Sequence, residues 1–257
     1  MRDAVIVKNL AAIASGYWEQ PFHNFEHASH VILSANKLLK RINALDEDKY
    51  GDVLTSQDVH EHTYGIGTDP LTQFAIVFSA LCHDVCHTGV PNGQLAEEEP
   101  DLADEYCYRS IAEQHSTTVA WNLLMLPAFK NLRACIYQTR EECERFRQLV
   151  VNSIMATDIF DGDLKELRSA RWQQAFENAG PESPMTEVAL NKRATVVIEH
   201  IMQASDVSHT MQHWYIYQKW NERLFQEMYN SYKTGRWNKD PSEGWYKGEI
   251  GFFDNYM

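Results

Sequence analysis

Apolar residues recur at helical spacing along most of the chain, which predicts a mostly helical protein with a few irregular connectors and no internal repeat. The helices that this pattern predicts cover residues 4–15, 24–42, 71–82, 101–114, 117–126, 141–158 and 214–232. A further apolar-periodic stretch covers residues 194–202. The segment 71–82 is apolar nearly all round, so we expect it in the core of the molecule.

Two connectors stand out between these segments. Residues 43–70 are polar and rich in Asp and Gly, and we expect a loop or short helices there, with His60 and His62 exposed. Residues 180–184 (GPESP) are the clearest hinge. We do not interpret the hinge as a domain boundary, because Asp206 beyond it is expected to meet residues that precede it. Residues 1–257 are therefore predicted to form a single domain, with residues 1–16 as an N-terminal helix that leads into it.

Composition and charge narrow the classes of function. At 257 residues and 44% hydrophobic content, the chain is long enough for one large helical domain. It has no apolar run near the length of a membrane span and no layout of a signal peptide, so no direct membrane insertion is expected. Five cysteines without a disulfide-like framework fit a reducing, cytoplasmic compartment. A formal charge of −13 argues against a nucleic-acid partner, but not against a small phosphate ester if bound cations invert the local field.

The first candidate functional residues are His83 and Asp84, which directly follow the apolar segment 71–82. Placing an ionisable pair there costs several kcal/mol unless it is satisfied, and a divalent cation satisfies both groups at once. His23 and His27 are four residues apart, so we expect them on one face of a helix. Asp206 lies near the end of the apolar stretch 194–202. Three helices that each bring His or Asp to one depth in a bundle would form a metal centre.

These residues, in this order, resemble the catalytic domain of class I 3′,5′-cyclic nucleotide phosphodiesterases, within the superfamily of His-Asp metal-dependent phosphohydrolases. The matching segments are residues 22–28 (FHNFEHA), 83–89 (HDVCHTG), 110–115 (SIAEQH), 156–158 (ATD), 204–208 (ASDVS) and 249–254 (EIGFFD). The resemblance covers nearly the whole chain. It implies an all-α fold, a compact multi-helix bundle of the cyclic-nucleotide phosphodiesterase type with a central two-metal site.

The resemblance also implies a role for each matching residue. A tight Zn²⁺ would be bound by His27, His83, Asp84 and Asp206, with Asp84 also touching a second ion, Mg²⁺ or Mn²⁺. A hydroxide bridging the two metals would be the nucleophile, and His23 would be the general acid that protonates the leaving O3′ oxygen. Residues expected to orient His23 or to hydrogen-bond the waters of the second metal are His87, Glu113, His115, Thr157 and Asp158.

Substrate recognition departs from the family pattern. The family usually closes with Gln-x-Gly-Phe, whereas this chain has Glu249, which cannot donate a hydrogen bond when ionised. We expect little discrimination between cAMP and cGMP, with a slight preference for cGMP. The resemblance assigns stacking of the base to Phe252, the opposite apolar clamp to Leu224, and further contacts to His209 and Phe22. Cys86 replaces the usual aspartate.

The expected function is hydrolysis of a 3′,5′-cyclic nucleotide, cAMP or cGMP, to the 5′-monophosphate. Two alternatives stay open at this point: a degenerate domain that binds cyclic nucleotide as a sensor, and another His-Asp-type nucleotide phosphohydrolase. The sequence also leaves open a homodimer and an attached regulatory or sensor domain in a longer parent protein. If that parent is anchored in a membrane, the domain is expected on its cytosolic side.

Overall fold

The computed structural model describes residues 2–44, 55–177 and 186–256, which form helices joined by loops, with no strand among them. This confirms the predicted all-α class. The α-helices are α1 (Arg2–Ala14), α2 (Phe25–Asn43), α4 (Ser56–His62), α5 (Pro70–Cys82), α6 (Asn92–Glu98), α7 (Pro100–Glu105), α8 (Ile111–Met125), α9 (Lys130–Ile136), α10 (Arg140–Met155), α11 (Gly162–Trp172), α12 (Glu187–Asp206), α13 (Trp214–Lys233) and α14 (Trp245–Tyr256). Four shorter turns of helix are η1 (Ile66–Thr68), η2 (Pro127–Phe129), η3 (Gln173–Glu177) and η4 (Ser208–Met211).

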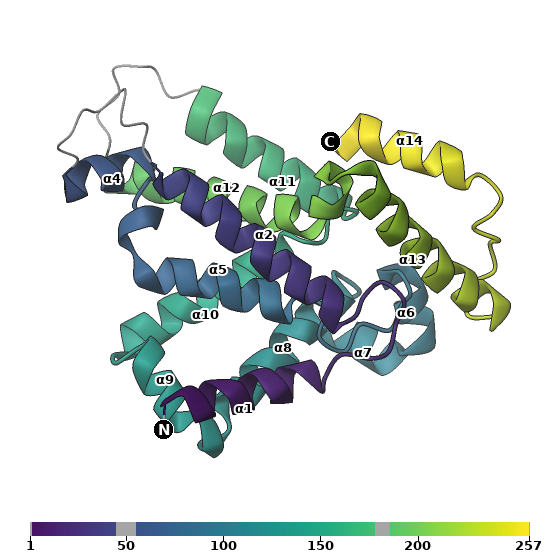
Figure 1. Ribbon diagram of the computed structural model, residues 1–257, viewed down its shortest axis with the longest axis horizontal. Coiled ribbons are helices and arrows are strands. Elements are labelled where there is room, and N and C mark those ends of the chain that lie inside the picture. Colours follow the sequence, from purple (N-terminus) through teal and green to yellow (C-terminus); the bar gives the residue numbers. More distant parts are fainter. Residues whose placement is uncertain (1, 45–54, 178–185, 257) are drawn as a thin grey trace.

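Helix α5 is the central element, and it runs between α2 and α10 (Figure 1). The carboxylate of Asp69 caps its first turn by accepting hydrogen bonds from the backbone N–H groups of Leu71 and Thr72, and Pro70 occupies the first helical position, where its missing N–H costs nothing. The helix is buried on several sides, as its apolar sequence predicts. Its last residue, Cys82, is fully buried, so the chain leaves the helix deep inside the molecule.

Two hydrophobic clusters meet on α5. The first is centred on Phe146 of α10, whose ring lies near those of Phe78, Trp121 and Tyr137. The second joins α2, α5 and α12. Its fully buried members include Val31, Ile76 and Met202. Because α2 and α12 pack on the same side of α5, the polar residues near their ends are brought to one region.

The first cluster allows a test of stability. Phe146 is completely buried, so Phe146→Ala should lower the free energy of unfolding by about 3–5 kcal/mol, through lost burial and the cavity left behind. Phe160→Ala is the control, because that ring is 75% exposed and its loss should change the free energy by less than about 0.5 kcal/mol. Urea unfolding followed by circular dichroism measures both. Equal losses of unfolding free energy in the two variants would contradict the placement of Phe146 in the core.

The segment 101–126 differs from its prediction as two helices interrupted near residue 116. The break falls earlier, between α7 and α8, where Cys107, Tyr108 and Ser110 adopt left-handed backbone angles. Helix α8 then passes through Ser116 without interruption. The Ser116 hydroxyl is buried and donates to the backbone carbonyl of Val85, 2.8 Å away, so it ties α8 to the turn after α5.

The position of His23 differs from its prediction. His23 does not lie on a helix with His27, because Asn24 is the N-cap of α2 and accepts a hydrogen bond from the His27 backbone N–H. His23 therefore belongs to the preceding turn.

The connector 43–70 contains α4 and η1, in keeping with short helices there. The hinge 180–184 and residues 45–54 lie outside the described residues.

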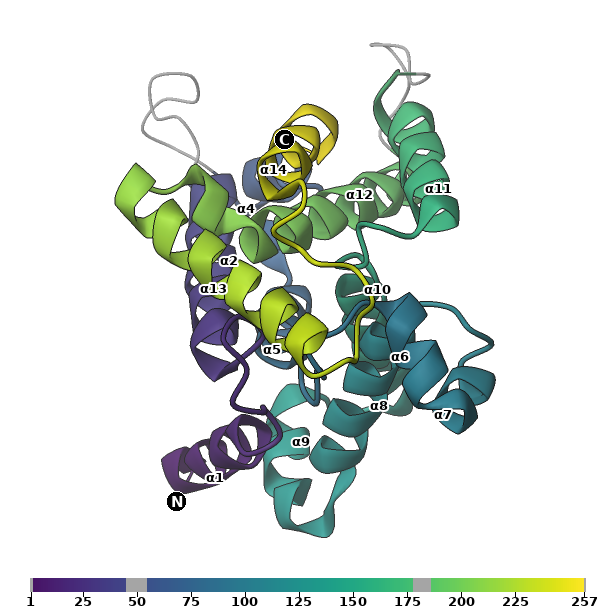
Figure 2. The same ribbon diagram turned by 90° about the vertical axis from the view of Figure 1, so that its right-hand side faces the viewer.

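The last two helices enclose one side of the molecule. In Figure 2, α13 runs diagonally across the face toward the viewer, and the segment after it passes beside α6 before α14 begins. An ion pair between Arg236, just after α13, and Glu98 of α6 fixes this path, with Nη2 and Oε2 2.6 Å apart. Among the described helices, none combines the length and apolarity needed to cross a bilayer.

Candidate metal centre and substrate cavity

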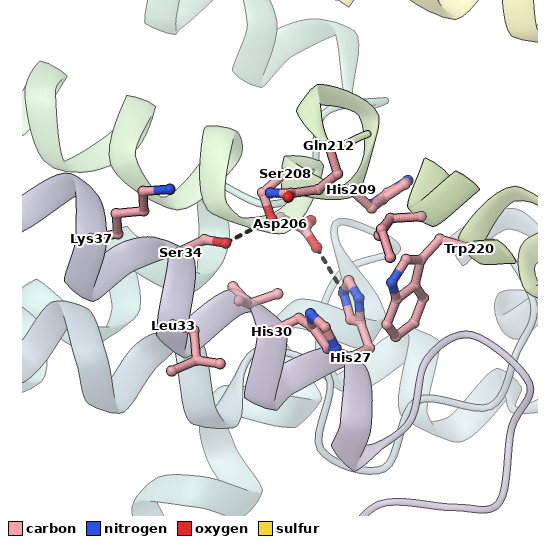
Figure 3. Close-up of a pocket in the computed structure, with 12 residues that line it drawn as sticks. His27, His30, Leu33, Ser34, Lys37, Asp206, Ser208, His209, Gln212 and Trp220 are labelled. Carbon is pink, nitrogen blue, oxygen red and sulfur yellow. Dashed lines mark hydrogen bonds and ion pairs between the residues drawn. The ribbon is translucent and has the colours of Figure 1, made fainter. Parts of the chain in front are cut away.

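Four side chains from three parts of the chain converge below α13. His27 comes from the first turns of α2, His83 and Asp84 follow directly after α5, and Asp206 ends α12. One ligand atom from each lies within 4.8 Å of the others. His27 Nε2 is 2.9 Å from Asp206 Oδ1, and His83 Nε2 is 3.0 Å from Asp84 Oδ2. Figure 3 shows the contact between His27 and Asp206 as a dashed line.

The protonation of the cluster suits a bound cation. His83 Nδ1 donates to the carbonyl oxygen of Ala80, 3.1 Å away, which leaves the lone pair of Nε2 directed at the cluster. Both His83 Nε2 and Asp84 Oδ2 are buried and have no hydrogen-bond partner within the described part of the chain. A buried nitrogen lone pair beside a buried carboxylate oxygen is costly unless a cation lies between them. Two imidazoles and two carboxylates are a ligand set that fits Zn²⁺ and similar ions.

The carboxyl groups are also held in their charged form. Burial alone would raise the pKa of Asp84 and Asp206. The imidazole of His83 beside Asp84, and those of His27 and His83 beside Asp206, outweigh burial and place the pKa values of both carboxyls below their ordinary range. Both carboxylates therefore offer ionised oxygen atoms that can bind a metal.

A cavity of about 920 Å³ opens above this cluster. Asp84 and Asp206 lie on its wall, so a molecule in the cavity can reach the metal-binding atoms. The residues expected to contact substrate, Phe22, His209, Leu224, Glu249 and Phe252, all line it. A smaller cavity of about 260 Å³ borders the same cluster, and Asp206 and His209 line both (Figure 3).

His23 is fixed in the large cavity by Glu227 of α13. Glu227 Oε2 accepts hydrogen bonds from the backbone N–H groups of Phe22 and His23, at 2.8 and 2.9 Å, while Oε1 contacts His23 Nδ1. Burial by itself would lower the pKa of His23, but the charge of Glu227 and its hydrogen bond raise that pKa to about 9. His23 is therefore protonated at neutral pH, and Nδ1 is the nitrogen that pairs with Glu227.

His87 packs face to face with His23, with ring centroids 3.8 Å apart. Burial and the positive charge of His23 lower the pKa of His87 to about 4, so His87 is neutral. Its Nδ1 accepts a hydrogen bond from the backbone N–H of Gly89, 3.1 Å away. His87 thus supports the orientation of the His23 ring without competing for its proton.

A second polar group lies on the wall of the cavity near Asp84. It contains Glu113, Thr157 and Asp158, and Asn92 connects its two carboxyls by donating to Glu113 Oε2 at 2.9 Å and to Asp158 Oδ2 at 3.4 Å. Burial and then the charge of Asp158 raise the pKa of Glu113 to about 7. His115 does not join this group. Its ring lies 6.4 Å from that of Tyr106, and it does not line the cavity.

Sequence reasoning missed Glu227 and Asn92. Glu227 is 2% exposed within the aromatic-rich helix α13, two helical turns after the buried Trp220. A charged residue in register with a buried aromatic residue is a signal that could have identified it. Asn92 offers no such signal, because it is simply the first residue of a short helix, directly after Pro91. Cys86 is not part of any His, Cys, Asp or Glu group that could hold a metal among the described residues.

Comparisons with known proteins give the family of this helical protein. The sequence profile described as 3′5′-cyclic nucleotide phosphodiesterase matches residues 22–249. The chain therefore belongs to the 3′,5′-cyclic nucleotide phosphodiesterase family, a family of hydrolases.

Relatives agree with this assignment. The mouse protein "dual specificity calcium/calmodulin-dependent 3′,5′-cyclic nucleotide phosphodiesterase 1C" is 26% identical over 230 residues, which are 88% of this chain and 27% of that protein. The Caenorhabditis elegans "probable 3′,5′-cyclic-AMP phosphodiesterase pde-4" is 27% identical over 232 residues, 88% of this chain and 30% of that protein. The chain thus spans about 27–30% of the length of these relatives.

Solved structures support the fold. The phosphodiesterase domain of the rhodopsin phosphodiesterase from the choanoflagellate Salpingoeca rosetta superposes with a TM-score of 0.70 at 21% identity. The match covers 96% of this chain and 72% of that domain's chain in one crystal structure, and 69% in another. The family is metal-dependent, and the His/Asp cluster described above is a group that could hold the ion.

Proposed function

We propose that this region hydrolyses a 3′,5′-cyclic nucleotide to the 5′-monophosphate, and that residues 1–257 act as one catalytic domain. The observation that carries the proposal is the shared cavity: Asp84 and Asp206 of the metal-binding cluster line the same space as the paired His23 and Glu227. That arrangement offers the two things that phosphodiester hydrolysis needs, positive charge at the phosphorus and a proton for the leaving oxygen.

The four-residue cluster is proposed to hold Zn²⁺, and Asp84 with the waters near Glu113, Thr157 and Asp158 to hold Mg²⁺ or Mn²⁺. When bound, such ions would neutralise charge on the phosphoryl oxygens and lower the pKa of the attacking water. Asp84 belongs to the cluster and lines the same cavity as Glu113, Thr157 and Asp158, so it is the side chain suited to connect the two groups. Asn92 keeps Glu113 and Asp158 apart at a fixed spacing.

His23 is proposed to donate the proton to the O3′ oxygen. Because Glu227 engages Nδ1, Nε2 is the nitrogen left to face the substrate. Glu227 has a pKa of about 2, since the charge of His23 outweighs the effect of burial, and it therefore stays ionised and stabilises the protonated imidazole. Glu227 itself touches neither substrate nor metal in this scheme and is a positioning residue.

The role of Glu227 can be tested by Glu227→Gln. We expect kcat to fall by about 10–100-fold, as for other groups that orient an active-site histidine or metal ligand, while metal content is unchanged. The pH dependence of kcat should also change, because the carboxylate no longer raises the pKa of His23. Glu222→Gln on the exposed side of the same helix is the matched control. Wild-type kcat and pH dependence in Glu227→Gln would exclude the positioning role.

The proposed function itself is tested with purified protein supplied with Zn²⁺ and with Mg²⁺ or Mn²⁺, and offered cAMP and cGMP separately. We expect 5′-AMP or 5′-GMP by chromatography, and no product after chelation of the metals. Binding of a cyclic nucleotide without turnover would instead support a sensor domain. If the protein neither binds nor hydrolyses a cyclic nucleotide, both the phosphodiesterase and the sensor domain are contradicted.

An attached regulatory or sensor domain is a separate proposal. Its support is that one relative is named as calcium/calmodulin-dependent and that a structural neighbour belongs to a rhodopsin phosphodiesterase. The size of the natural protein would test this proposal. A comparison of its activity with that of residues 1–257 alone would show whether an attached domain regulates it.

A further inference from the structure

Arg236 connects α6 and the end of α13 to the turn that follows His87. Its Nε and Nη2 pair with the two carboxylate oxygens of Glu98 on α6, at 3.0 and 2.6 Å. The remaining Nη1 donates to the backbone carbonyl oxygen of Thr88, 2.8 Å away, which also accepts from Gln20 Nε2 at 3.2 Å. A two-point pair between a guanidinium and a carboxylate fixes the plane of both groups, so Glu98 holds Nη1 toward Thr88.

The turn itself determines how His87 is held. Gly89 has a backbone φ of +77°, a left-handed angle that favours glycine. In that conformation the Gly89 N–H donates to His87 Nδ1, 3.1 Å away. The Gly89 carbonyl oxygen accepts from the buried hydroxyl of Ser231 on α13, at 3.1 Å. Both backbone carbonyls of the turn are therefore bound by the end of α13 or by the segment just after it.

The turn leads directly to the proposed proton donor. The ring of His87 packs on that of His23 with centroids 3.8 Å apart. Contact between packed rings weakens within a fraction of an ångström, so a displaced turn would change the support that His87 gives to His23. Glu227 of α13 binds His23 directly. The same part of the chain thus holds the donor at two points, once through a carboxylate and once through the turn.

Two contacts anchor the chain between the metal-binding Asp84 and this turn. The carbonyl oxygen of Val85 accepts from the Ser116 hydroxyl at 2.8 Å, and the N–H of Cys86 donates to the carbonyl oxygen of Gly16 at 3.0 Å. Neither contact involves α13 or the segment that follows it. A displacement that starts at the turn is therefore expected to leave the metal-binding atoms in place.

We propose that Arg236 is a positioning residue for the proton donor, and that it acts through the turn at Thr88 on His87 and so on His23. The inference rests on the proposed function and adds to it a residue that is not one of the described residues lining the large cavity. Its consequence is selective. Removal of Arg236 should slow protonation of the leaving oxygen and leave metal binding unchanged, whereas loss of a purely structural clamp would not distinguish between substrates.

The experiment compares Arg236→Ala with the wild type on a 3′,5′-cyclic nucleotide and on an activated p-nitrophenyl phosphodiester. On the cyclic nucleotide we expect kcat to fall about tenfold, with KM and metal content unchanged. On the ester we expect a loss of less than about twofold, because its leaving group departs without a proton. Arg236→Lys keeps the charge but lacks the planar fork, so it should recover little of the loss.

Arg140→Ala is the matched control. Arg140 is 86% exposed, and its ion pair is with the exposed Glu144 on the same helix. An exposed pair of this kind contributes little to stability, and it lies in a different part of the fold from the turn. The variant should therefore keep the wild-type kcat on both substrates.

A double-mutant cycle tests the path from Arg236 to the donor. In His87→Ala, the further change Arg236→Ala should lower kcat by less than about twofold, because the group through which Arg236 acts is already gone. A general loss of stability would instead appear equally in both backgrounds. A further tenfold loss in His87→Ala would overturn the inference.

A second measurement separates the inference from the proposed function. The NMR ring signals of His23 and His87 in histidine-labelled protein report their packing whether or not a cyclic nucleotide is hydrolysed. We expect Arg236→Ala to shift both signals and Arg140→Ala to shift neither, and in a protein without turnover this result would still support the path from Arg236 to His23. Unchanged ring signals in Arg236→Ala, or equal losses of kcat on the two substrates, would overturn the inference.

Discussion

Asp206→Ala should abolish turnover while the helical fold persists. The change removes one of the four metal-binding groups and leaves His27 Nε2 without its partner at 2.9 Å. Three ligands remain, and a tight site for a divalent cation becomes a weak one. Metal content by mass spectrometry after gel filtration should fall from one tightly bound ion to a substoichiometric amount, and cyclic-nucleotide hydrolysis should fall below detection.

The fold should survive because Asp206 is the last residue of α12, and the packing of that helix rests on Ile198, Ile201 and Met202. Circular dichroism of the variant should therefore match the wild type. Asp163→Ala is a matched control, since that carboxylate is 68% exposed and its ion pair within the described part of the chain is with Arg109, which is also exposed. Full metal occupancy together with retained activity in Asp206→Ala would remove Asp206 from the site.

His23→Ala should lower kcat by about 10²–10⁴-fold, the usual cost of losing a positioned proton donor. Metal content should not change, because His23 lies in the turn before α2 and its Nδ1 pairs with Glu227. The lost step is protonation of the leaving oxygen. An ester whose leaving group is acidic enough to depart unprotonated, such as a p-nitrophenyl phosphodiester, should therefore lose much less activity in the variant.

The comparison of the two substrates distinguishes the roles open to His23. Equal losses of kcat on both would mean that His23 is structural or binds a metal. His62→Ala serves as the control for a histidine that is exposed and does not line the cavity, and it should keep both activities. Because Glu227 is left buried when His23 is removed, thermal stability of His23→Ala should be measured alongside.

The sequence allowed the metal cluster to be predicted because three of its four residues lie where an apolar element ends. His83 and Asp84 follow the buried α5, and Asp206 ends α12. Polar side chains at the buried end of an apolar helix need partners, so those at the ends of α5 and α12 are expected to lie together. Glu227 acts through a contact with His23, 204 residues away in the chain, and its local signal is its register with the buried Trp220 on α13.

The helices were predicted better than their ends. Helical periodicity gives the position of an apolar face. The end of a helix is determined instead by capping side chains and by residues whose backbone angles are not helical. The left-handed angles at Cys107, Tyr108 and Ser110 have no signature in those residue types, so the break before α8 was misplaced. Asn24 is a typical N-cap, and weighing it as one would have placed His23 outside α2.

The central claim is that water attacks the phosphorus of a 3′,5′-cyclic nucleotide in this cavity. The most direct measurement is hydrolysis of cAMP and of cGMP by the metal-loaded protein in water enriched in oxygen-18, with mass spectrometry of the product. We expect 5′-monophosphate that carries a single oxygen-18 atom on phosphorus. A 3′-monophosphate, label in the sugar hydroxyl, or no product from either nucleotide would contradict the account.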